Sequence, residues 1–594
     1  MAGPSDTGIN QSEFYLMRNR NPVNPPGLKT SLLSKVLAGM FVMSHLAFAK
    51  EEHLTFVSPA RELGSRHPFS MNPSGHPASL TAFYLSSRTM FVPGREKPWV
   101  CELCEVFPSY ENGLISNIEE ADQPFNLKIN LTIKKNLKWG DGSPLSGKDL
   151  YFTWQVAKNI PGKFFGKSMY ERIEHIVVDD NDPLNVTLYF RDREYFHADW
   201  GQWVILSEHV DKSVWEKYQS QPELYLSRSN YSLNPENQGL WSGPYLPEKN
   251  SVKGRERYIR NTYLPGESGT IEKIDWVFDI GQAKNQKVVL VSAGYCELNQ
   301  SVCDNHKLNY HEMTEENNQY EQITLNLRNP ILRDHRVREA LYKSIARDPI
   351  YQKIYRGGVA PAWQFFPSTN PWFDHNVKFI DEDIDYAKKL LEQSEWLEPR
   401  TTDEKNQSAG IRQKQGKSLE LTLVTDRSDN RVQVARYLIE SWKKIGIDVT
   451  LVIQDKKTFT TKTLRRLDFP GLALFAWEIP HDVSLVSLFG SGSVPNIKNR
   501  YRGQNLSAWT HHKTDQTLNR LRGEFDFNLR KKYLIELQKN YVEDIPSIPL
   551  FFKLTKALKT NNLPNTILPD NSFPMTISSK NWVISRTSLS QSTR

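Results

Sequence analysis

A chain of 594 residues is longer than one ordinary domain, so about two to four lobes are expected. Its hydrophobic fraction of 38% and charged fraction of 24% are those of a folded protein and exclude an intrinsically disordered one. The formal net charge of +7 comes from Lys and Arg scattered among acidic residues, so no nucleic-acid partner is expected.

The N-terminal region has the pattern of a signal peptide. Lys29 and Lys35 precede the apolar run VLAGMFVMSHLAFA, which ends in the cleavage motif Ala47-Phe48-Ala49. The run is too short to span a bilayer comfortably, and an ordinary buried helix is the alternative interpretation. No cysteine follows the cleavage motif for lipid attachment. Residues 1–49 are therefore predicted to be an N-terminal extension and signal peptide, and the mature protein is expected in the periplasm.

The four cysteines form two local pairs, Cys101/Cys104 in WVCELCE and Cys296/Cys303 in GYCELNQSVCD. In an exported protein an even number of cysteines favours disulfides, although three connectivities are possible. A zinc site would need a different spacing, and a redox C-x-x-C motif would need a thioredoxin-like βαβ unit around it. Structural disulfides are expected. An exported thiol–disulfide protein that uses Cys101 and Cys104 is the alternative from another functional class.

The first clear passage along the chain is a strand, a tight turn and a helix. LKINLTIKK alternates apolar and polar residues, which is typical of a strand with one buried face. The turn NLKWGDGSP follows, and Trp139 is expected to close the core beneath it. Ser146 and Asp149 have capping-box spacing and predict the start of a helix. LNVTLYF, residues 184–190, is another predicted strand.

From residue 255 onward the predicted elements are first strands and then, after about Tyr320, strands that alternate with helices. RERYIRNTYLPG, IEKIDWVFDI and QITLNLRN are predicted strands, and residues 334–358 are predicted to form one helix that ends at Gly357-Gly358. DEDIDYAKKLLEQSEWL is a second predicted helix, and residues 400–417 are predicted to be an exposed loop. LELTLVT, RVQVARYLIESWKKIG, IDVTLVIQD and GLALFAWEI then predict strand, helix, strand and strand. This alternation indicates an α/β fold.

No catalytic, metal or cofactor motif is present. The sequence contains no G-x-S-x-G elbow, no H-E-x-x-H and no Walker loop. His511 and His512 are adjacent, so they point in different directions on a regular element, and a metal role is not expected. The chain is predicted not to be an enzyme.

The stretch LTIKKNLKWGDGSPLSGKDLYFTWQ resembles the most recognisable segment of the family 5 solute-binding proteins of bacterial ABC importers. In that family a strand ending in Leu-Arg-x-x-x-x-Trp runs into x-Asp-Gly-x-Pro and then into a helix. Further resemblances follow in the family's order from about residue 95 to 553, in SGPY, LNLRNPILRDHRVREALYKSIARDPI, DYAKKLLEQSEW, ESWKKIGIDVTLVIQD and YVEDIPSIPLFF.

The resemblance implies a periplasmic-binding-protein-like α/β fold, with two large lobes around a ligand cleft and an inserted third lobe. By this analogy residues 50–94, 235–315 and 556–594 form lobe I. Residues 95–234 form the inserted lobe II, and residues 316–555 form lobe III.

The resemblance also suggests where a ligand binds. Peptide-binding members carry Trp-x-Ala-Asp, and that Asp holds the peptide's α-ammonium. Here the segment is AWEIPHDVSL, in which Trp477 matches but Pro480 stands at the Asp position. The predicted ligand contacts are Ala476, Trp477 and Glu478 first, and Asp482 second. The alternative is that both acids are merely exposed, and no Arg directly precedes Trp477 to bind a ligand carboxylate.

The function implied is that of a substrate-binding component of an ABC importer. It would capture peptides or peptide-like solutes by hinge closure, as a monomer without a cofactor, and deliver them to an inner-membrane permease. A binder of nickel chelate, haem or oligosaccharide with the same fold is the first alternative. A periplasmic chaperone is a further class.

Overall fold

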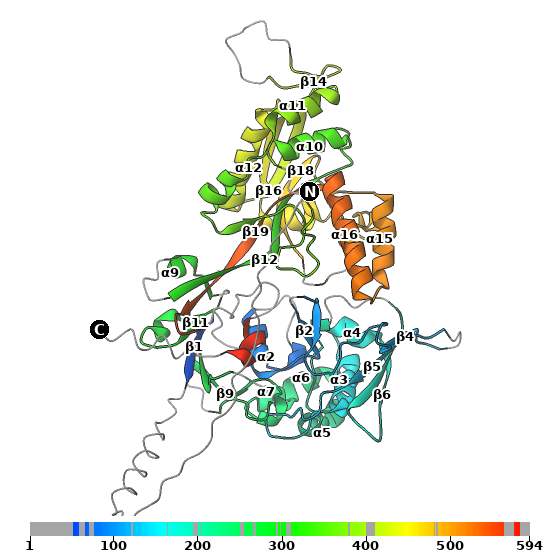
Figure 1. Ribbon diagram of the computed structural model, residues 1–594, viewed down its shortest axis with the longest axis vertical. Coiled ribbons are helices and arrows are strands. Elements are labelled where there is room, and N and C mark those ends of the chain that lie inside the picture. Colours follow the sequence, from blue (N-terminus) through cyan, green and yellow to red (C-terminus); the bar gives the residue numbers. More distant parts are fainter. Residues whose placement is uncertain are drawn as a thin grey trace, which may run out of the picture. The chain divides into compact units, whose positions relative to one another are not determined.

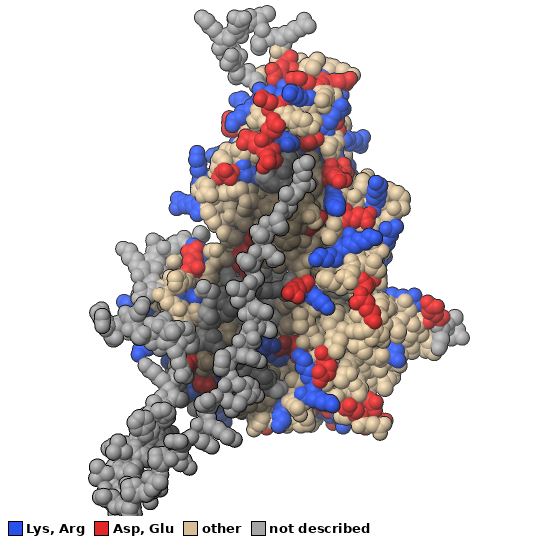
Figure 2. Space-filling view, in the orientation of Figure 1, with Lys and Arg blue, Asp and Glu red and all other residues tan. Residues whose placement is uncertain are grey.

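The computed structural model describes residues 52–58, 66–70, 77–94, 96–119, 123–162, 164, 166–193, 200–201, 203–249, 255–264, 269–292, 295–296, 299–304, 310–377, 381–399, 410–479, 482, 485–563 and 575–582. The predicted extension and signal peptide, residues 1–49, lie outside these ranges. No helix within them has the length and apolar character that crossing a membrane requires. On the face shown in Figure 2, basic and acidic side chains are interspersed, in agreement with the sequence.

An eleven-stranded mixed sheet is the main element of the fold (Figure 1). Its order is β17 (Asp448–Gln454), β16 (Glu420–Asp426), β18 (Leu472–Glu478), β12 (Tyr310–Leu325), β19 (Ser547–Thr560), β11 (Val289–Val291), β1 (His53–Val57), β10 (Lys273–Val277), β9 (Arg255–Arg260) and β8 (Tyr245–Pro247). The eleventh strand, β13 (Val359–Pro361), pairs with β19. The long strands β12 and β19 are antiparallel and lie at the centre of this order.

Two of the predicted lobe boundaries, at 315/316 and 555/556, fall inside β12 and β19. The pairing of these two strands is irregular at that point, with a register shift between Glu316 and Tyr320. Such bulges bend a strand and raise its local twist. The division of the chain into three lobes stays a prediction.

The predicted strand–helix–strand passage after residue 419 is confirmed. β16 and β17 are parallel, with Leu421 opposite Val449, and α12 (Asp429–Lys443) connects them and packs on both. Figure 1 shows α12 beside β16 and β18. Leu438 and Trp442 of α12 share one apolar core with Leu423 of β16. This unit carries β18, which pairs with β16 at its first residues.

A second, four-stranded sheet has the order β4 (Ile115–Asn117), β5 (Leu127–Thr132), β7 (Asn185–Phe190) and β6 (Ile173–Val178). The alternating burial of β5 confirms its prediction. Both hydrogen bonds of the capping box formed by Ser146 and Asp149 are present at the start of α3 (Gly147–Asn159). Burial raises the pKa of Asp149 to about 6. Trp139 is 1% exposed, so it closes the core beneath its turn, as predicted.

The remaining helices are α2 (Pro77–Ser86), α4 (Lys167–Arg172), α5 (Glu208–Tyr218), α6 (Pro222–Arg228), α7 (Asn230–Leu233), α9 (Gln300–Asp304), α10 (His335–Lys343), α11 (Ile384–Gln393), α13 (Lys456–Thr458), α14 (Val486–Phe489), α15 (His512–Arg522) and α16 (Phe527–Asp544). Most of them are short, and several pack on one another, as α10 does on α11 and α15 on α16. Short turns of other helical types are η1 (Pro68–Ser70), η3 (Gln238–Leu240), η4 (Ile280–Ala283), η5 (Ile350–Ile354), η6 (Phe459–Leu464), η7 (Ser491–Ser493) and η8 (Met575–Asn581). The short strands β2 (Phe91–Pro93) and β3 (Trp99–Cys101) pair with each other.

The prediction of one helix over residues 334–358 is wrong. α10 ends at Lys343, and the chain forms the separate π-helical turn η5 at Ile350–Ile354. Pro349 has no backbone N–H, and in a continuous helix its ring would clash with the carbonyl four residues earlier, so the chain breaks before it and Pro349 lies in the first turn of the next helical segment. The hydroxyl of Ser344, at the end of α10, donates to the carbonyl of Leu341.

Part of the predicted exposed loop at 400–417 forms a hairpin instead. Residues 400–409 lie outside the described ranges, and β14 (Gln413–Lys414) pairs with β15 (Lys417–Ser418). Gln415 and Gly416 between them have φ values of 52° and 74°, as a two-residue hairpin turn requires.

The cysteines form the two local disulfides. The Cα atoms of Cys101 and Cys104 are 5.2 Å apart, and those of Cys296 and Cys303 are 5.6 Å apart. All four are buried. Cys101 ends strand β3 rather than beginning a helix, where a redox-active thiolate would be stabilised. The geometry therefore gives no support to a thiol–disulfide enzyme.

His67 joins the N-terminal segment to the helices near the four-stranded sheet. Its ring is fully buried, with ring centres 5.3 Å from Tyr225 and 5.2 Å from Tyr231. The backbone N–H of Phe69 donates to its Nδ1 at 3.1 Å. Burial lowers the pKa of His67 to about 3, so the folded protein holds this ring neutral.

This burial predicts a loss of stability in acid. Because the ordinary histidine pKa is near 6.5, the unfolded chain takes up a proton below that pH and the folded chain does not. His67→Gln keeps a hydrogen-bond acceptor and cannot be protonated. Between pH 7.5 and 5.5 we expect the native protein to lose about 1.4 kcal/mol more unfolding free energy than this variant does, measured by urea denaturation. His175→Gln, at an exposed position, is the control. Equal losses in all three proteins would contradict the prediction. Asp149, whose raised pKa makes folding more favourable as the pH falls, is present in all three proteins, so its contribution cancels from the comparison.

Candidate functional site

The carboxyl end of β18 lies at a cavity of about 740 Å³. Of the four predicted ligand contacts, Ala476, Trp477 and Glu478 line it and Asp482 does not. The full lining is Gln319, Asp426, Arg431, Lys456, Phe459, Thr460, Leu464, Arg465, Phe475, Ala476, Trp477, Glu478, Tyr501, Arg502, Gly503, Gln504, Leu506 and Lys553. The size is that of a ligand site.

One side of β18 is open at this cavity. On the other side, β12 pairs with the strand along its whole length, from Leu325 opposite Leu472 to Gln319 opposite Glu478. β16 pairs only with Leu472 and Ala473. From Phe475 to Glu478 the strand therefore has no described strand partner on the β16 side. An open edge of this kind can pair with an extended chain.

A buried ion-pair network forms one wall of the cavity. The guanidinium of Arg431, on α12, donates to both carboxylate oxygens of Glu321 on β12 and, at 2.5 Å, to Asp426 at the end of β16. Burial opposes the charge of Arg431, but the two carboxylates outweigh it and raise its pKa. This network ties α12 to β12 and β16 beside the open edge.

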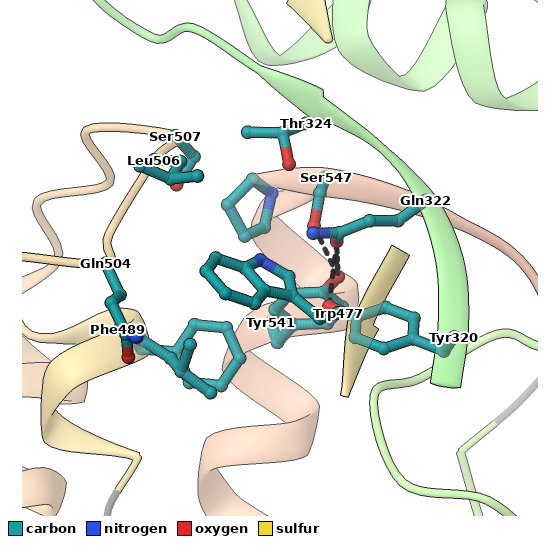
Figure 3. A pocket seen from close by; sticks show the side chains of 12 residues that line it. Tyr320, Gln322, Thr324, Trp477, Phe489, Gln504, Leu506, Ser507, Tyr541 and Ser547 are labelled. Carbon is teal, nitrogen blue, oxygen red and sulfur yellow. Dashed lines mark hydrogen bonds between the residues drawn. The ribbon is translucent and has the colours of Figure 1, made fainter. Parts of the chain in front are cut away.

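A small pocket lies behind Trp477 (Figure 3). Its volume is about 20 Å³, too small for a ligand side chain in this conformation. The Tyr320 hydroxyl donates to Oε1 of Gln322 at 2.8 Å, and the hydroxyls of Tyr541 and Ser547 are hydrogen-bonded to each other. Burial raises the pKa of Tyr541 to about 12, so its hydroxyl stays protonated. Trp477 thus lines both this small pocket and the cavity of about 740 Å³.

The loop that carries Tyr501 to Gln504 is held in an uncommon conformation. Arg500 and Tyr501 have φ values of 53° and 54°, a region that costs non-glycine residues of the order of 1–2 kcal/mol each. The guanidinium of Arg466 lies 5.7 Å from the centre of the Tyr501 ring. At Gly503 a Cβ would overlap the backbone oxygen of Ser493. Strain of this kind is often found at functional sites.

Asp482 lies away from the cavity in a buried contact. Its carboxylate is 1% exposed and accepts from Arg530 of α16 at 3.2 Å and from the indole N–H of Trp99 at 3.1 Å. Glu478, by contrast, is exposed at the cavity. The two acids that the sequence offered as ligand contacts, Glu478 first and Asp482 second, therefore have different surroundings.

Sequence reasoning missed most of the charged lining. Arg431, Lys456, Arg465, Arg502 and Lys553 come from separate parts of the chain, and nothing in their local sequences distinguishes them from surface cations. Their convergence follows only from the folding of α12, η6 and β19 around β18.

Residues 118–495 match the family described as bacterial extracellular solute-binding proteins, family 5, middle region. The chain belongs to this family. Members of the family are solute-binding proteins rather than enzymes.

Two curated relatives are oligopeptide-binding proteins. OppA of Lactococcus lactis subsp. lactis is 25% identical over 410 residues, which is 62% of this chain and 66% of that protein. AppA of Bacillus subtilis (strain 168) is 22% identical over 492 residues, 76% of this chain and 83% of the relative. The match thus spans just under two thirds of the lactococcal protein's length.

Solved structures of the family share the fold. The periplasmic murein tripeptide-binding protein MppA, in an unliganded open form, has a TM-score of 0.68 at 16% identity, over 90% of this chain and 98% of that one. AppA from Bacillus subtilis in complex with a nonapeptide has a TM-score of 0.52 at 17% identity, over 90% and 99%. NikZ from Campylobacter jejuni in complex with Ni(L-His) has a TM-score of 0.54 at 18% identity, over 90% and 100%. The predicted periplasmic-binding-protein-like α/β fold is confirmed.

The steric contact at Gly503 generates a stability prediction. Gly503→Ala forces a methyl group against backbone that no side-chain rotation can move, and we expect a loss of roughly 1–3 kcal/mol of unfolding free energy. Gly492→Ala is the matched control, because a Cβ there meets nothing within 4 Å. Chemical denaturation of both variants measures the difference, and equal stabilities would refute the contact.

The different surroundings of Asp482 and Glu478 generate a second prediction. Asp482→Asn removes the carboxylate from a buried ion pair with Arg530, and we expect a loss of about 3–5 kcal/mol. Glu478→Gln, at an exposed position, is expected to change stability by less than about 0.5 kcal/mol. Thermal and urea unfolding of the two variants test this. An Asp482→Asn protein as stable as the native one would return Asp482 to consideration as a ligand group.

Proposed function

We propose that this protein captures peptides or peptide-like solutes for an ABC importer and delivers them to an inner-membrane permease. The observation that carries the proposal is the open edge of β18 from Phe475 to Glu478 beside the cavity of about 740 Å³. An extended peptide can add to such an edge through main-chain hydrogen bonds, which makes binding tolerant of side-chain sequence. The oligopeptide-binding relatives OppA and AppA support the choice of ligand.

The aromatic lining suits this ligand. Phe475 and Trp477 lie on the same strand with ring centres 5.4 Å apart at 73°, and Tyr501 completes an apolar wall. Aromatic faces bury much area without demanding one side-chain identity. Glu478 supplies a carboxylate at the rim for a cationic group of the ligand. Ala476, Trp477 and Glu478 are therefore proposed as ligand contacts, whereas Asp482 is proposed to stabilise the fold.

Closure around the ligand is proposed to occur at β12 and β19. These strands pair with each other across the centre of the sheet, and their register shifts between Glu316 and Tyr320. A bulged strand pair can bend more easily than a regular one, and a ligand favours the closed state only through extra contacts made there. Export by the predicted signal peptide and a monomeric state in the periplasm complete the proposal.

Native mass spectrometry of the protein purified from its own source tests this function. We expect co-purified peptides that are released on denaturation. Trp477→Ala is expected to lower affinity for them at least about tenfold, as aromatic contact residues do. Trp154→Ala, a half-buried tryptophan of α3, is the control and should bind normally.

Two other results of this experiment would change the proposal in different ways. Peptides bound equally by the native protein and Trp477→Ala would keep the function and reject the site. A released metal chelate, haem or oligosaccharide in place of peptides would reject the peptide proposal in favour of the alternative within the same fold.

A further inference from the structure

The cavity beside β18 has a lining in which cationic side chains outnumber carboxylates. Basic and acidic side chains are interspersed over the face in Figure 2. The cavity lining, by contrast, holds five cationic side chains and two carboxylates. The cations are Arg431, Lys456, Arg465, Arg502 and Lys553, and the carboxylates are Asp426 and Glu478.

One of these cations, Arg431, is already paired with two carboxylates, so its network carries one net negative charge. Arg431 is held between Glu321 and Asp426, with ion pairs to both. Glu321 is 1% exposed, so this network is part of the wall and uses up the Asp426 carboxylate. Neither Arg431 nor Asp426 is therefore available to form an ion pair with a ligand.

The other four cations have no such partners. The side chains of Lys456, Arg465, Arg502 and Lys553 make no ion pair and no hydrogen bond with any described residue. They come from α13, from the residue after η6, from the Tyr501 loop and from β19. Like charges gathered around a cavity repel one another, so this arrangement does not favour stability. An anion bound among them would relieve that repulsion.

The acids at the cavity do not balance them: the Arg431 network contributes one negative charge and Glu478 another, against four positive charges. Glu478 is the one lining carboxylate outside the Arg431 network among the described residues, and it stands at the end of β18. A ligand with one ammonium near Glu478 would still face four cations. A single carboxylate on the ligand would leave most of them unpaired.

From this imbalance we infer that the preferred ligands are acidic peptides, which carry carboxylate side chains in addition to their terminal carboxylate. The inference rests on the proposed function and adds the ligand's charge to it. The open edge of β18 binds the peptide backbone, Phe475 and Trp477 contact its apolar portions, and the four cations select acidic side chains. Selection by charge is compatible with tolerance of sequence, because flexible Lys and Arg side chains can follow a carboxylate to several positions.

Competition between matched peptide pools tests the inference. Three pools cover di- to decapeptides of Ala and Phe in which the variable positions hold only Glu, only Gln or only Lys. We expect the Glu pool to bind at least about tenfold more tightly than the Gln pool in native mass spectrometry and calorimetry. The preference should shrink as ionic strength rises, because salt screens the attraction.

Paired variants separate the cavity from the overall charge. Lys456→Met and Arg465→Gln are expected to reduce the ratio of Glu-pool to Gln-pool affinity severalfold each. Lys457→Met and Lys462→Met remove the same charge from neighbouring exposed positions that do not line the cavity, and should leave the ratio unchanged. Equal effects of the two pairs would overturn the inference.

The remaining outcomes distinguish this inference from the function it rests on. Peptide binding with no preference for Glu over Gln, or with a preference for Lys, would overturn the inference and leave peptide capture intact. Failure of every pool, together with release of a non-peptide ligand from the native protein, would overturn both.

Discussion

The antiparallel pairing of β12 with β19 is the interaction on which the rest of the structure depends. These two long strands join one end of the sheet, built from residues 53–291, to the other end, built from residues 420–478. The same pair positions β18, since β12 pairs with it along its whole length. On its other side β18 pairs with β16 only at Leu472 and Ala473, so the open edge proposed as the ligand site begins where β16 stops pairing. The site is a consequence of strand lengths in one sheet.

Around the open edge of β18, some features stabilise the fold and others lower its stability. The Arg431 network is compact, buried and satisfied, and it holds α12 on the sheet. A few residues away, the lining keeps unpaired cations, and Arg500 and Tyr501 keep a costly backbone conformation. Local features that lower stability are expected where a protein binds something, because the bound state compensates for them. This contrast within one cavity distinguishes the structural wall from the surface proposed to bind the ligand.

Predictions from the sequence were correct for elements whose conformation depends on neighbouring residues. The alternation in β5, the capping box of Ser146 and Asp149, and the α/β passage after residue 419 were all predictable, because burial on one face and satisfied helix ends leave periodic signals. The same rules joined residues 334–358 into one helix, because the apolar spacing continued past Pro349 and outweighed the break that proline imposes. Asp482 was grouped with Glu478 by proximity in sequence, although Arg530 and Trp99 reach it from distant segments.

From the sequence alone we could predict the family, the α/β fold class and the strand that ends in Ala476, Trp477 and Glu478. These features follow from short-range patterns of apolar, polar and turn residues. Which charged side chains lie close together became apparent only from the folded chain. Lys456, Arg465, Arg502 and Lys553 are spread over about a hundred residues and look like solvated surface cations until the fold brings them around one cavity. Electrostatic energy depends on distance in space and on burial, and neither is written in the local sequence.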